Sequence, residues 1–343
     1  MDDYPMKIAP PNVLVIPITD SCGGRCQMCG IWRTPNRPPV PLERLARIFA
    51  ESYLSANLTH INVTGGEPLH HPDLAGIASL FSRRCPALRE VSINTSGLNP
   101  EDMDQIAPFR EALPNGVFFN VTVSLDGIGA LHDRIRGVKH AWEHTLESID
   151  RALAMARNAE RMSVHINCTL SRDNHNAVGP VTQFAREHNI PLSLTYAAVN
   201  DLYLRNNDGK HARFILLDDH QTALASSLDR LQEDEEFPAT QRHFFRMLSG
   251  MLRGQPRSSP CVYQSKGIFL DLDGTVYPCG TAHALPYGKL PEESFEAIYS
   301  GPTGDEIRRA LQARFCPGCP SNSYYGLADG VWLDVLRAQR SSK

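Results

Sequence analysis

Three cysteines near the start of the chain have the number and spacing of a metal-binding loop. They follow the pattern Cys-x3-Cys-x2-Cys and are Cys22, Cys26 and Cys29. Three thiolates can bind three irons of a [4Fe-4S] cluster and leave the fourth iron open, whereas a structural zinc ion takes a closed set of four ligands. Chance cysteines, or a zinc loop with a fourth ligand from elsewhere, are the alternative interpretations. The loop is therefore a candidate site for an iron that can still bind a substrate or a cofactor.

A second set of cysteines lies in the last quarter of the chain. Its members are Cys261, Cys279, Cys316 and Cys319. Four thiolates complete a coordination sphere, so this set fits either a second [4Fe-4S] cluster or a four-cysteine zinc ribbon. A cluster held by four thiolates has no iron open to substrate, and its natural role is to take or give one electron.

Six short strands alternate with helical stretches in the first 200 residues. The strands are expected at residues 13–18, 60–64, 90–95, 119–125, 163–169 and 191–196, and helices at 42–53, 74–84, 142–159 and 178–188. This βα repeat predicts parallel strands with helices outside, and so an α/β fold.

Polar and apolar residues alternate within these strands. The polar positions are His60, Asn62, Thr64, Ser92, Asn94, Asn120, Thr122, Ser124, His165, Asn167, Thr169, Ser193 and Thr195. In a barrel the apolar face meets the helices, so the polar face points into the lumen, where a closed barrel would pack bulky branched side chains. The pattern predicts a cavity lined with hydrogen-bonding groups, although individual residues can instead satisfy one another.

Short polar motifs end the second, third and fourth strands, at the edge where barrels bind ligands. Gly65, Gly66, Glu67 and Pro68 follow the second strand, and glycine there lets the backbone approach a ligand closely. Asn94, Ser124, Asp126 and Arg136 follow in the next two units. Taken alone, the Gly-Gly-Glu-Pro run also fits a simple turn, and Arg136 a solvent-facing helix residue.

The cysteine loop, the Gly-Gly-Glu-Pro run and the βα repeat together resemble the radical S-adenosylmethionine (SAM) superfamily. The resemblance implies a partial (β/α)6 TIM-like barrel and a [4Fe-4S] cluster whose open iron binds SAM. It also implies electron transfer that cleaves SAM to a 5'-deoxyadenosyl radical, which takes hydrogen from a C-H bond. The residues it assigns to SAM are Gly65, Gly66, Glu67, Pro68, Asn94, Ser124, Asp126, Arg136 and Asn167.

The second cysteine set resembles the twitch domain, the shortened form of the SPASM auxiliary-cluster domain, with residues 269–279 as its β-hairpin. The resemblance implies one auxiliary [4Fe-4S] cluster on Cys261, Cys279, Cys316 and Cys319. The expected domains are the barrel at 1–199, a helical linker at 200–259, and the twitch domain with a C-terminal helix at 260–343. Partial barrel and single auxiliary cluster together resemble the aminocyclitol dehydrogenases.

The leading hypothesis for function is oxidation of a hydroxyl-bearing carbon in a small polar substrate, such as an aminosugar, a cyclitol or a nucleoside-like natural-product intermediate. Radical epimerisation needs a thiol to return hydrogen, and only Cys85 and Cys168, which read as structural, remain for that role. Peptide maturation is a further alternative, but only about a dozen residues precede the first strand, too few for a leader-binding domain. A zinc-stabilised binding module is the non-enzyme alternative.

No residue stands out as the base that would deprotonate the substrate. His60, His165, Tyr196 and Cys168 are weak candidates, and a satisfied core histidine is the plainer interpretation of the first two.

Composition sets the broad class of the protein. The 343 residues are 42% hydrophobic and 21% charged, with a formal charge of -4, which is ordinary for a globular protein. No basic stripe, signal peptide or membrane span is visible, so neither nucleic acid nor a membrane is an expected partner. Nine cysteines without an export signal indicate a reducing cytoplasm and metal binding. The resemblance adds an external one-electron donor of the flavodoxin or ferredoxin type.

Overall fold

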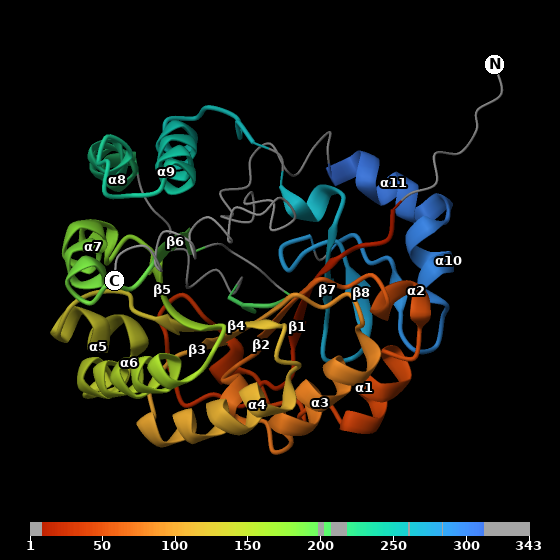
Figure 1. Ribbon diagram of the computed structural model, residues 1–343. Helices are drawn as coiled ribbons and strands as arrows, with labels where there is room; N and C mark the ends of the chain where they lie inside the picture. The colour runs from red at the N-terminus through yellow and green to blue at the C-terminus, as the bar shows by residue number, and fades with distance from the viewer. Residues whose placement is uncertain (1–8, 198–201, 207–217, 260, 283, 312–343) are drawn as a thin grey trace.

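One curved sheet organises the molecule (Figure 1). The computed structural model describes residues 9–197, 202–206, 218–259, 261–282 and 284–311. In these residues the strand order is β6-β5-β4-β3-β2-β1-β7-β8-β9, and the first six strands in the chain are parallel. They are β1 (Val13–Pro17), β2 (His60–Thr64), β3 (Glu90–Thr95), β4 (Phe118–Ser124), β5 (Met162–Leu170) and β6 (Leu192–Tyr196).

Helices follow the strands and cover the outer side of the sheet (Figure 1). They are α1 (Leu42–Ile48), α2 (Ser52–Ser55), α3 (Leu74–Arg84), α4 (Ile106–Ala112), α5 (Ala130–Arg136), α6 (Ala141–Asn158) and α7 (Val178–Glu187), with the 3-10 turns η1 (Ile31–Arg33), η2 (Pro68–His70), η3 (Pro100–Gln105) and η4 (His175–Ala177). The predicted α/β class and partial (β/α)6 barrel are confirmed. Helices α4 and α5 were not among the predicted elements, and α5 ends on Arg136.

The apolar strand positions form the core between the sheet and the helices. Ile61, Val63, Val91, Ile93 and Val121 are at most 1% exposed. Because burying such side chains is the main favourable term in folding, the alternation fixes which face of each strand meets the helices. The predicted assignment of the apolar face is confirmed.

One helix boundary differs from the prediction. Residues 42–53 were expected to form one helix, but α1 ends at Ile48 and α2 begins at Ser52. Phe49 and Leu54 are both fully buried. Five residues span 500° of an α-helix, which would place these two side chains about 140° apart, and the break lets both reach the core.

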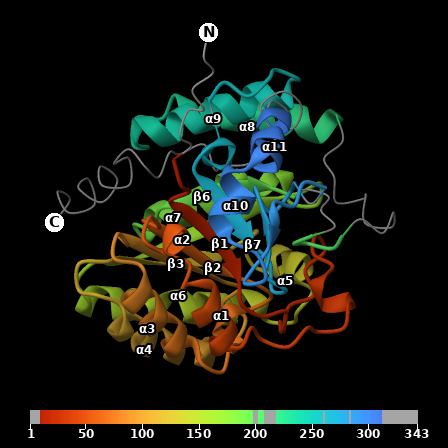
Figure 2. The same cartoon turned by 90° about the vertical axis from the view of Figure 1, so that its right-hand side faces the viewer.

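The C-terminal part adds a hairpin to the same sheet. Strand β7 (Gly267–Leu270) pairs in parallel with β1 (Figure 2). Strands β8 (Thr275–Tyr277) and β9 (Gly288–Lys289) continue the sheet antiparallel. The other elements there are η6 (Val262–Gln264), α10 (Phe295–Ser300) and α11 (Pro302–Ala310). The predicted hairpin is confirmed. The sequence analysis did not predict that its first strand, β7, pairs with β1 of the barrel sheet. Cys316, Cys319 and the predicted C-terminal helix lie outside the described residues.

The stretch predicted as a helical linker holds two packed helices, α8 (Asp218–Gln232) and α9 (Ala239–Leu252). It also holds a non-helical segment, 202–206, which crosses the cysteine loop. The Gly30 amide donates to the Leu204 carbonyl at 2.7 Å, and Asn206 Nδ2 donates to the Met28 carbonyl at 2.7 Å. The proposed domain boundaries stay a prediction.

An arginine ties the cysteine loop to the hairpin. Arg37 Nε lies 2.8 Å from Asp20 Oδ2, and Arg37 Nη1 lies 2.7 Å from Asp271 Oδ2 in the turn after β7. Arg205 Nη2 also lies 2.8 Å from Asp20 Oδ2. The two parts that carry the cysteine sets are therefore joined by a shared sheet and by an ion-pair network.

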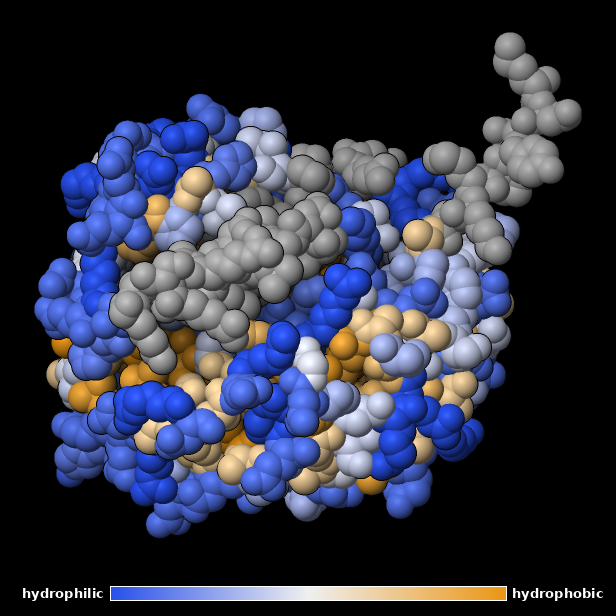
Figure 3. Space-filling view, viewed as in Figure 1, coloured by the Kyte–Doolittle hydropathy of each residue, from blue (hydrophilic) through white to orange (hydrophobic). Residues whose placement is uncertain are grey.

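No helix in the described ranges is both long enough and apolar enough to span a bilayer. Hydrophilic residues cover much of the outer helices on the face shown in Figure 3, including α8.

Candidate functional site

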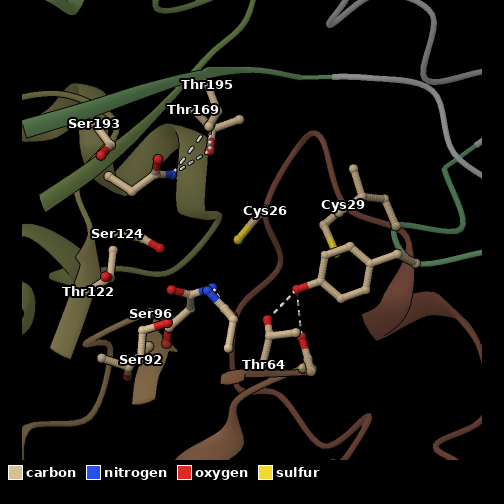
Figure 4. Close-up of a pocket in the computed structure, with 18 of the residues that line it drawn as sticks. Cys26, Cys29, Thr64, Ser92, Ser96, Thr122, Ser124, Thr169, Ser193 and Thr195 are labelled. Carbon is tan, nitrogen blue, oxygen red and sulfur yellow. Dashed lines mark hydrogen bonds between the residues drawn. The ribbon is translucent and has the colours of Figure 1, made fainter. Parts of the chain in front are cut away.

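A cavity of about 480 Å³ occupies the barrel lumen. It reaches from the cysteine loop to His60 and Glu90, the first residues of β2 and β3. The five residues of β2 span about 13 Å at 3.3 Å per residue, so the cavity runs along the whole strand. The described strand residues that line it include His60, Asn62, Thr64, Glu90, Ser92, Asn94, Asn120, Thr122, Ser124, His165, Asn167, Thr169, Ser193, Thr195 and Tyr196. The predicted polar lumen is confirmed (Figure 4).

The three cysteines of the loop face one end of this cavity. The Gly24 amide donates to Cys22 Sγ at 3.4 Å, and Arg136 Nη1 donates to Cys26 Sγ at 3.6 Å. Burial, together with the neighbouring thiols, raises the pKa of Cys22 to about 12 and of Cys29 to about 11. Thiolates gathered in such a site need a cation to form, which fits a metal centre.

The three thiols on the loop fit a cube that leaves one iron without a protein ligand. A single zinc ion needs all its ligands within about 2.3 Å, whereas each thiolate of a cube binds a different iron.

Gly65 and Gly66 line the cavity, and their backbone packs directly on the cysteine loop. The Gly66 amide donates to the Thr19 carbonyl at 2.7 Å. Gly65 has φ of 147°, and a Cβ there would lie 2.3 Å from the Thr19 carbonyl oxygen; a Cβ on Gly66 would lie 2.5 Å from the Ser21 carbonyl oxygen. Both glycines are therefore required for the loop to reach the rim, in addition to any ligand contact.

Glu67 points away from the cavity. Its carboxylate is 2% exposed and accepts hydrogen bonds from the Ser96 amide at 2.8 Å, from Ser96 Oγ at 2.6 Å and from the Leu69 amide at 3.2 Å. Neither Glu67 nor Pro68 is among the described lining residues. In this structure Glu67 joins two rim loops, and its assignment to SAM stays a prediction.

Asp126 and Arg136 form a buried ion pair beside the cysteine loop. Arg136 Nη2 lies 2.8 Å from Asp126 Oδ2, and the Thr169 amide donates to Asp126 Oδ1 at 2.7 Å. Arg136 is 8% exposed and Asp126 is 0% exposed. Burial raises the pKa of Asp126 against the opposing effect of Arg136. Arg136 therefore lines the cavity, pairs with Asp126 and contacts Cys26. An ion pair between Arg136 and the carboxylate of SAM stays a prediction.

The other predicted SAM residues lie on the lumen wall. Asn94 Nδ2 donates to Asn62 Oδ1 at 2.9 Å, and Asn167 Nδ2 donates to Thr169 Oγ1 at 3.3 Å. Ser124 has no hydrogen bond from its hydroxyl to a described residue, so this group remains available to a ligand (Figure 4). Hydroxyl and amide groups spaced around a cavity fit a ribose or an amino acid, so the lining is compatible with bound SAM.

A hydrogen-bonded chain crosses the far end of the lumen. Glu90 Oε1 accepts from Asn120 Nδ2 at 2.5 Å, Ser163 Oγ donates to Asn120 Oδ1, and Ser163 Oγ lies 2.9 Å from His165 Nε2. His60 Nε2 lies 3.6 Å from Glu90 Oε2. Sequence reasoning missed Glu90, although it occupies the first position of the polar face that continues through Ser92 and Asn94.

Ionisation of Glu90 makes stability pH-dependent. Burial raises its pKa from 4.5 to about 7. The folded state then holds the proton more tightly than the unfolded chain, so the free energy of unfolding falls as pH rises from about 4.5 to 7, by up to about 3 kcal/mol. Glu90→Gln keeps an acceptor for Asn120 and removes this slope. Urea denaturation at pH 5 and pH 8 should show a relative gain for the variant at pH 8 only; an unchanged slope would contradict the assignment.

The weak catalytic candidates separate into two groups. His60, His165 and Tyr196 line the cavity. Cys168 is fully buried in the core behind the sheet and is not among the described lining residues, and burial raises the pKa of its thiol. Cys85 is 3% exposed in the same core.

Two tyrosines that sequence reasoning missed close the cavity. The Tyr203 hydroxyl lies 2.6 Å from Thr64 Oγ1 (Figure 4), and its ring packs on Phe269 of β7. Tyr263 lines the cavity from η6, and its pKa is raised by burial and by Cys261 and Cys279. Cys261 and Cys279, two members of the C-terminal set, therefore lie near a residue that lines the cavity. No local signal marks either tyrosine, since both reach the lumen only through tertiary packing.

Comparisons with known proteins agree with this architecture. Residues 16–174 match the model of the radical SAM superfamily, and residues 261–320 match that of the SPASM iron-sulfur cluster-binding domain. The chain is 27% identical over 162 residues to a GTP 3',8-cyclase of Alkaliphilus metalliredigens, covering 45% of this chain and 47% of the relative. It therefore spans about half the length of that relative.

A second relative is matched over nearly its whole length. An AdoMet-dependent heme synthase of Methanosarcina barkeri is 24% identical, over 93% of this chain and 94% of the relative. The fold is similar to that of anSMEcpe, solved with bound AdoMet and a Cp18Cys peptide, at a TM-score of 0.62 and 17% identity, over 87% of this chain and 82% of that one. The chain carries a radical SAM superfamily domain over residues 16–174 and a SPASM iron-sulfur cluster-binding domain over residues 261–320.

Proposed function

We propose that this protein oxidises a hydroxyl-bearing carbon of a small polar substrate, using SAM cleavage on the first cluster for hydrogen abstraction and one auxiliary [4Fe-4S] cluster as electron acceptor. The substrate class is an aminosugar, a cyclitol or a nucleoside-like natural-product intermediate. The first cluster would lie on Cys22, Cys26 and Cys29, and the second on Cys261, Cys279, Cys316 and Cys319. A cytoplasmic setting with a flavodoxin or ferredoxin donor completes the proposal.

One observation carries the proposal: the polar cavity borders the three loop cysteines and reaches Tyr263, whose pKa is raised in part by Cys261 and Cys279 of the second set. Cys22, Cys26 and Cys29 line one part of the cavity, and Tyr263 lines another. A substrate in this cavity would lie between the group that takes hydrogen and the group that takes an electron.

The chain's own residues supply binding and orientation. Hydroxyls of Ser92, Thr122 and Ser193 face the cavity and can hydrogen-bond a polyol (Figure 4). Removal of the hydroxyl proton needs an acceptor, and burial lowers the pKa of both His60 and His165 to about 4, so each is neutral at pH 7 and able to accept a proton.

The lining does not favour a nucleoside triphosphate, the substrate class named by the cyclase relatives. Arg136 is the sole Lys or Arg among the described lining residues, and it is already paired with Asp126. Phosphate recognition usually uses several such cations. The position of Cys168 behind the sheet also argues against a thiol that returns hydrogen, as an epimerase requires. A peptide, like the one bound to anSMEcpe, is the remaining alternative.

The test is product analysis with the reconstituted protein under anaerobic conditions. Protein, SAM, reductant and candidate aminosugars, cyclitols and nucleosides are incubated, and 5'-deoxyadenosine is counted against product. The proposal expects one product per 5'-deoxyadenosine, two electrons more oxidised than the substrate. An isomer of unchanged mass indicates epimerisation, and turnover of peptides alone indicates maturation; either result contradicts the proposal.

A further inference from the structure

Glu90 is a buried carboxylate that no cation neutralises within the described residues. Its side chain is 13% exposed and lies at the end of the cavity opposite the cysteine loop. Asn120 Nδ2 donates to Oε1, and His60 Nε2 lies 3.6 Å from Oε2. A buried charge without a partner is unfavourable, so an acid in such a place needs a specific reason.

The neighbouring imidazoles do not supply the missing positive charge. Burial lowers the pKa of His60 to about 4, with a contribution from the exposed Arg89, and burial lowers that of His165 to about 4. Both rings are therefore neutral at pH 7. Burial correspondingly raises the pKa of Glu90 to about 7, as expected for a carboxyl group without a countercharge.

Unpaired hydroxyls surround the same space. Ser92, Thr122, Ser124 and Ser193 line the cavity, and their hydroxyls make no hydrogen bond to another described residue (Figure 4). Their neighbours Asn62, Asn94 and Asn167 are already hydrogen-bonded to the wall. The cavity wall thus carries the carboxyl group of Glu90 at the end opposite the cysteine loop and the four hydroxyl groups between that end and the loop.

We infer that Glu90 binds an amino group of the substrate, as its ammonium form, at the N-terminal end of the lumen. The hydroxyls of Ser92, Thr122 and Ser193 then bind the substrate's hydroxyl groups. The ammonium supplies the countercharge that Glu90 lacks and donates to its free oxygen. This inference rests on the proposed function and narrows the substrate to an aminated polyol.

The distance along the barrel suits such an arrangement. Thr64 at the rim and His60 at the far end are separated by about 13 Å of strand. A sugar-sized ring can lie within this length, with the amine at Glu90 and a carbinol carbon facing the rim end, where SAM is proposed to bind. The substrate's orientation is then fixed by its charged end.

The test compares matched pairs of ligands that differ only in an amino or a hydroxyl group. The pairs are D-glucosamine with D-glucose, scyllo-inosamine with scyllo-inositol, and 3'-amino-3'-deoxyadenosine with adenosine. Binding to the reconstituted protein with SAM is measured by calorimetry at pH 7, without turnover. We expect at least one amine to bind about 10- to 100-fold more tightly than its hydroxyl partner.

Two variants separate a specific role from a structural one. Glu90→Gln should abolish the preference for the amine, so that the amine and its hydroxyl partner bind with similar affinity. Glu147→Gln, an exposed position on α6 that changes net charge equally, should retain the preference. Cluster content and circular dichroism establish that each variant is folded.

The outcomes distinguish this inference from the proposed function. If the pairs bind without preference, or if Glu90→Gln keeps the preference, the role of Glu90 is overturned while a small polar substrate still stands. If no member of any pair binds, the proposed substrate class fails, and the inference fails with it.

Discussion

Cys26→Ala should abolish reductive SAM cleavage and lower the iron content from about eight to about four atoms per chain. Cys26 is one of three thiols on the loop, is 9% exposed, and is contacted by Arg136. With two thiolates left, the loop cannot hold the cube with one open iron. Iron and sulfide analysis and quantification of 5'-deoxyadenosine in an anaerobic assay measure the two effects.

Cys168→Ala is the matched control for this prediction. Cys168 is fully buried on the helix side of its strand, so its loss should leave both the iron content and SAM cleavage unchanged. A Cys26→Ala protein that still cleaves SAM would falsify the assignment of the loop. Loss of turnover in Cys168→Ala with iron intact would contradict the structural role of that residue and revive epimerisation.

Arg136→Leu should lower the free energy of unfolding by about 3–5 kcal/mol. The change leaves Asp126, which is fully buried, without its countercharge 2.8 Å away. The cost arises from the uncompensated carboxylate rather than from the strength of the pair itself. Urea denaturation at pH 7, followed by circular dichroism under anaerobic conditions, measures the change.

Two comparisons make this prediction specific. Arg134→Leu, at an exposed position of α5, should change stability by less than about 0.5 kcal/mol. Adding Asp126→Asn to Arg136→Leu should restore part of the lost stability, because no buried charge then remains. Equal losses for Arg134→Leu and Arg136→Leu, or a double variant weaker than the single one, would rule out the buried ion pair as the cause.

The strands illustrate what periodicity can predict. The predicted segments match β2 and β3 at both ends and the other parallel strands within one residue, because alternating side chains directly encode a half-buried strand. The break between α1 and α2 was missed, since it depends on Phe49 and Leu54 both reaching the core. The hydrophobic pattern of a short segment does not show where the core of the folded protein lies relative to a helix.

The candidate site divides in the same way. Spacing alone identified Cys22, Cys26 and Cys29, which the fold brings to the mouth of the predicted lumen. Glu67 was expected to face a ligand, yet its carboxylate is bound to Ser96 and Leu69, which no local motif foretells. A sequence motif indicates which residues lie near the cavity, and side-chain packing determines which of these residues point into it.

The sequence by itself determined the parallel α/β repeat, the polar lining of the barrel and the position of both cysteine sets in the chain. Tertiary structure alone decided that β7 joins β1, that Arg37 connects Asp20 with Asp271, and that Tyr263 and Glu90 close the cavity. The physical reason is separation along the chain. Periodicity and ligand spacing are local, whereas the charge balance of Glu90 depends on residues from distant strands that meet only after folding.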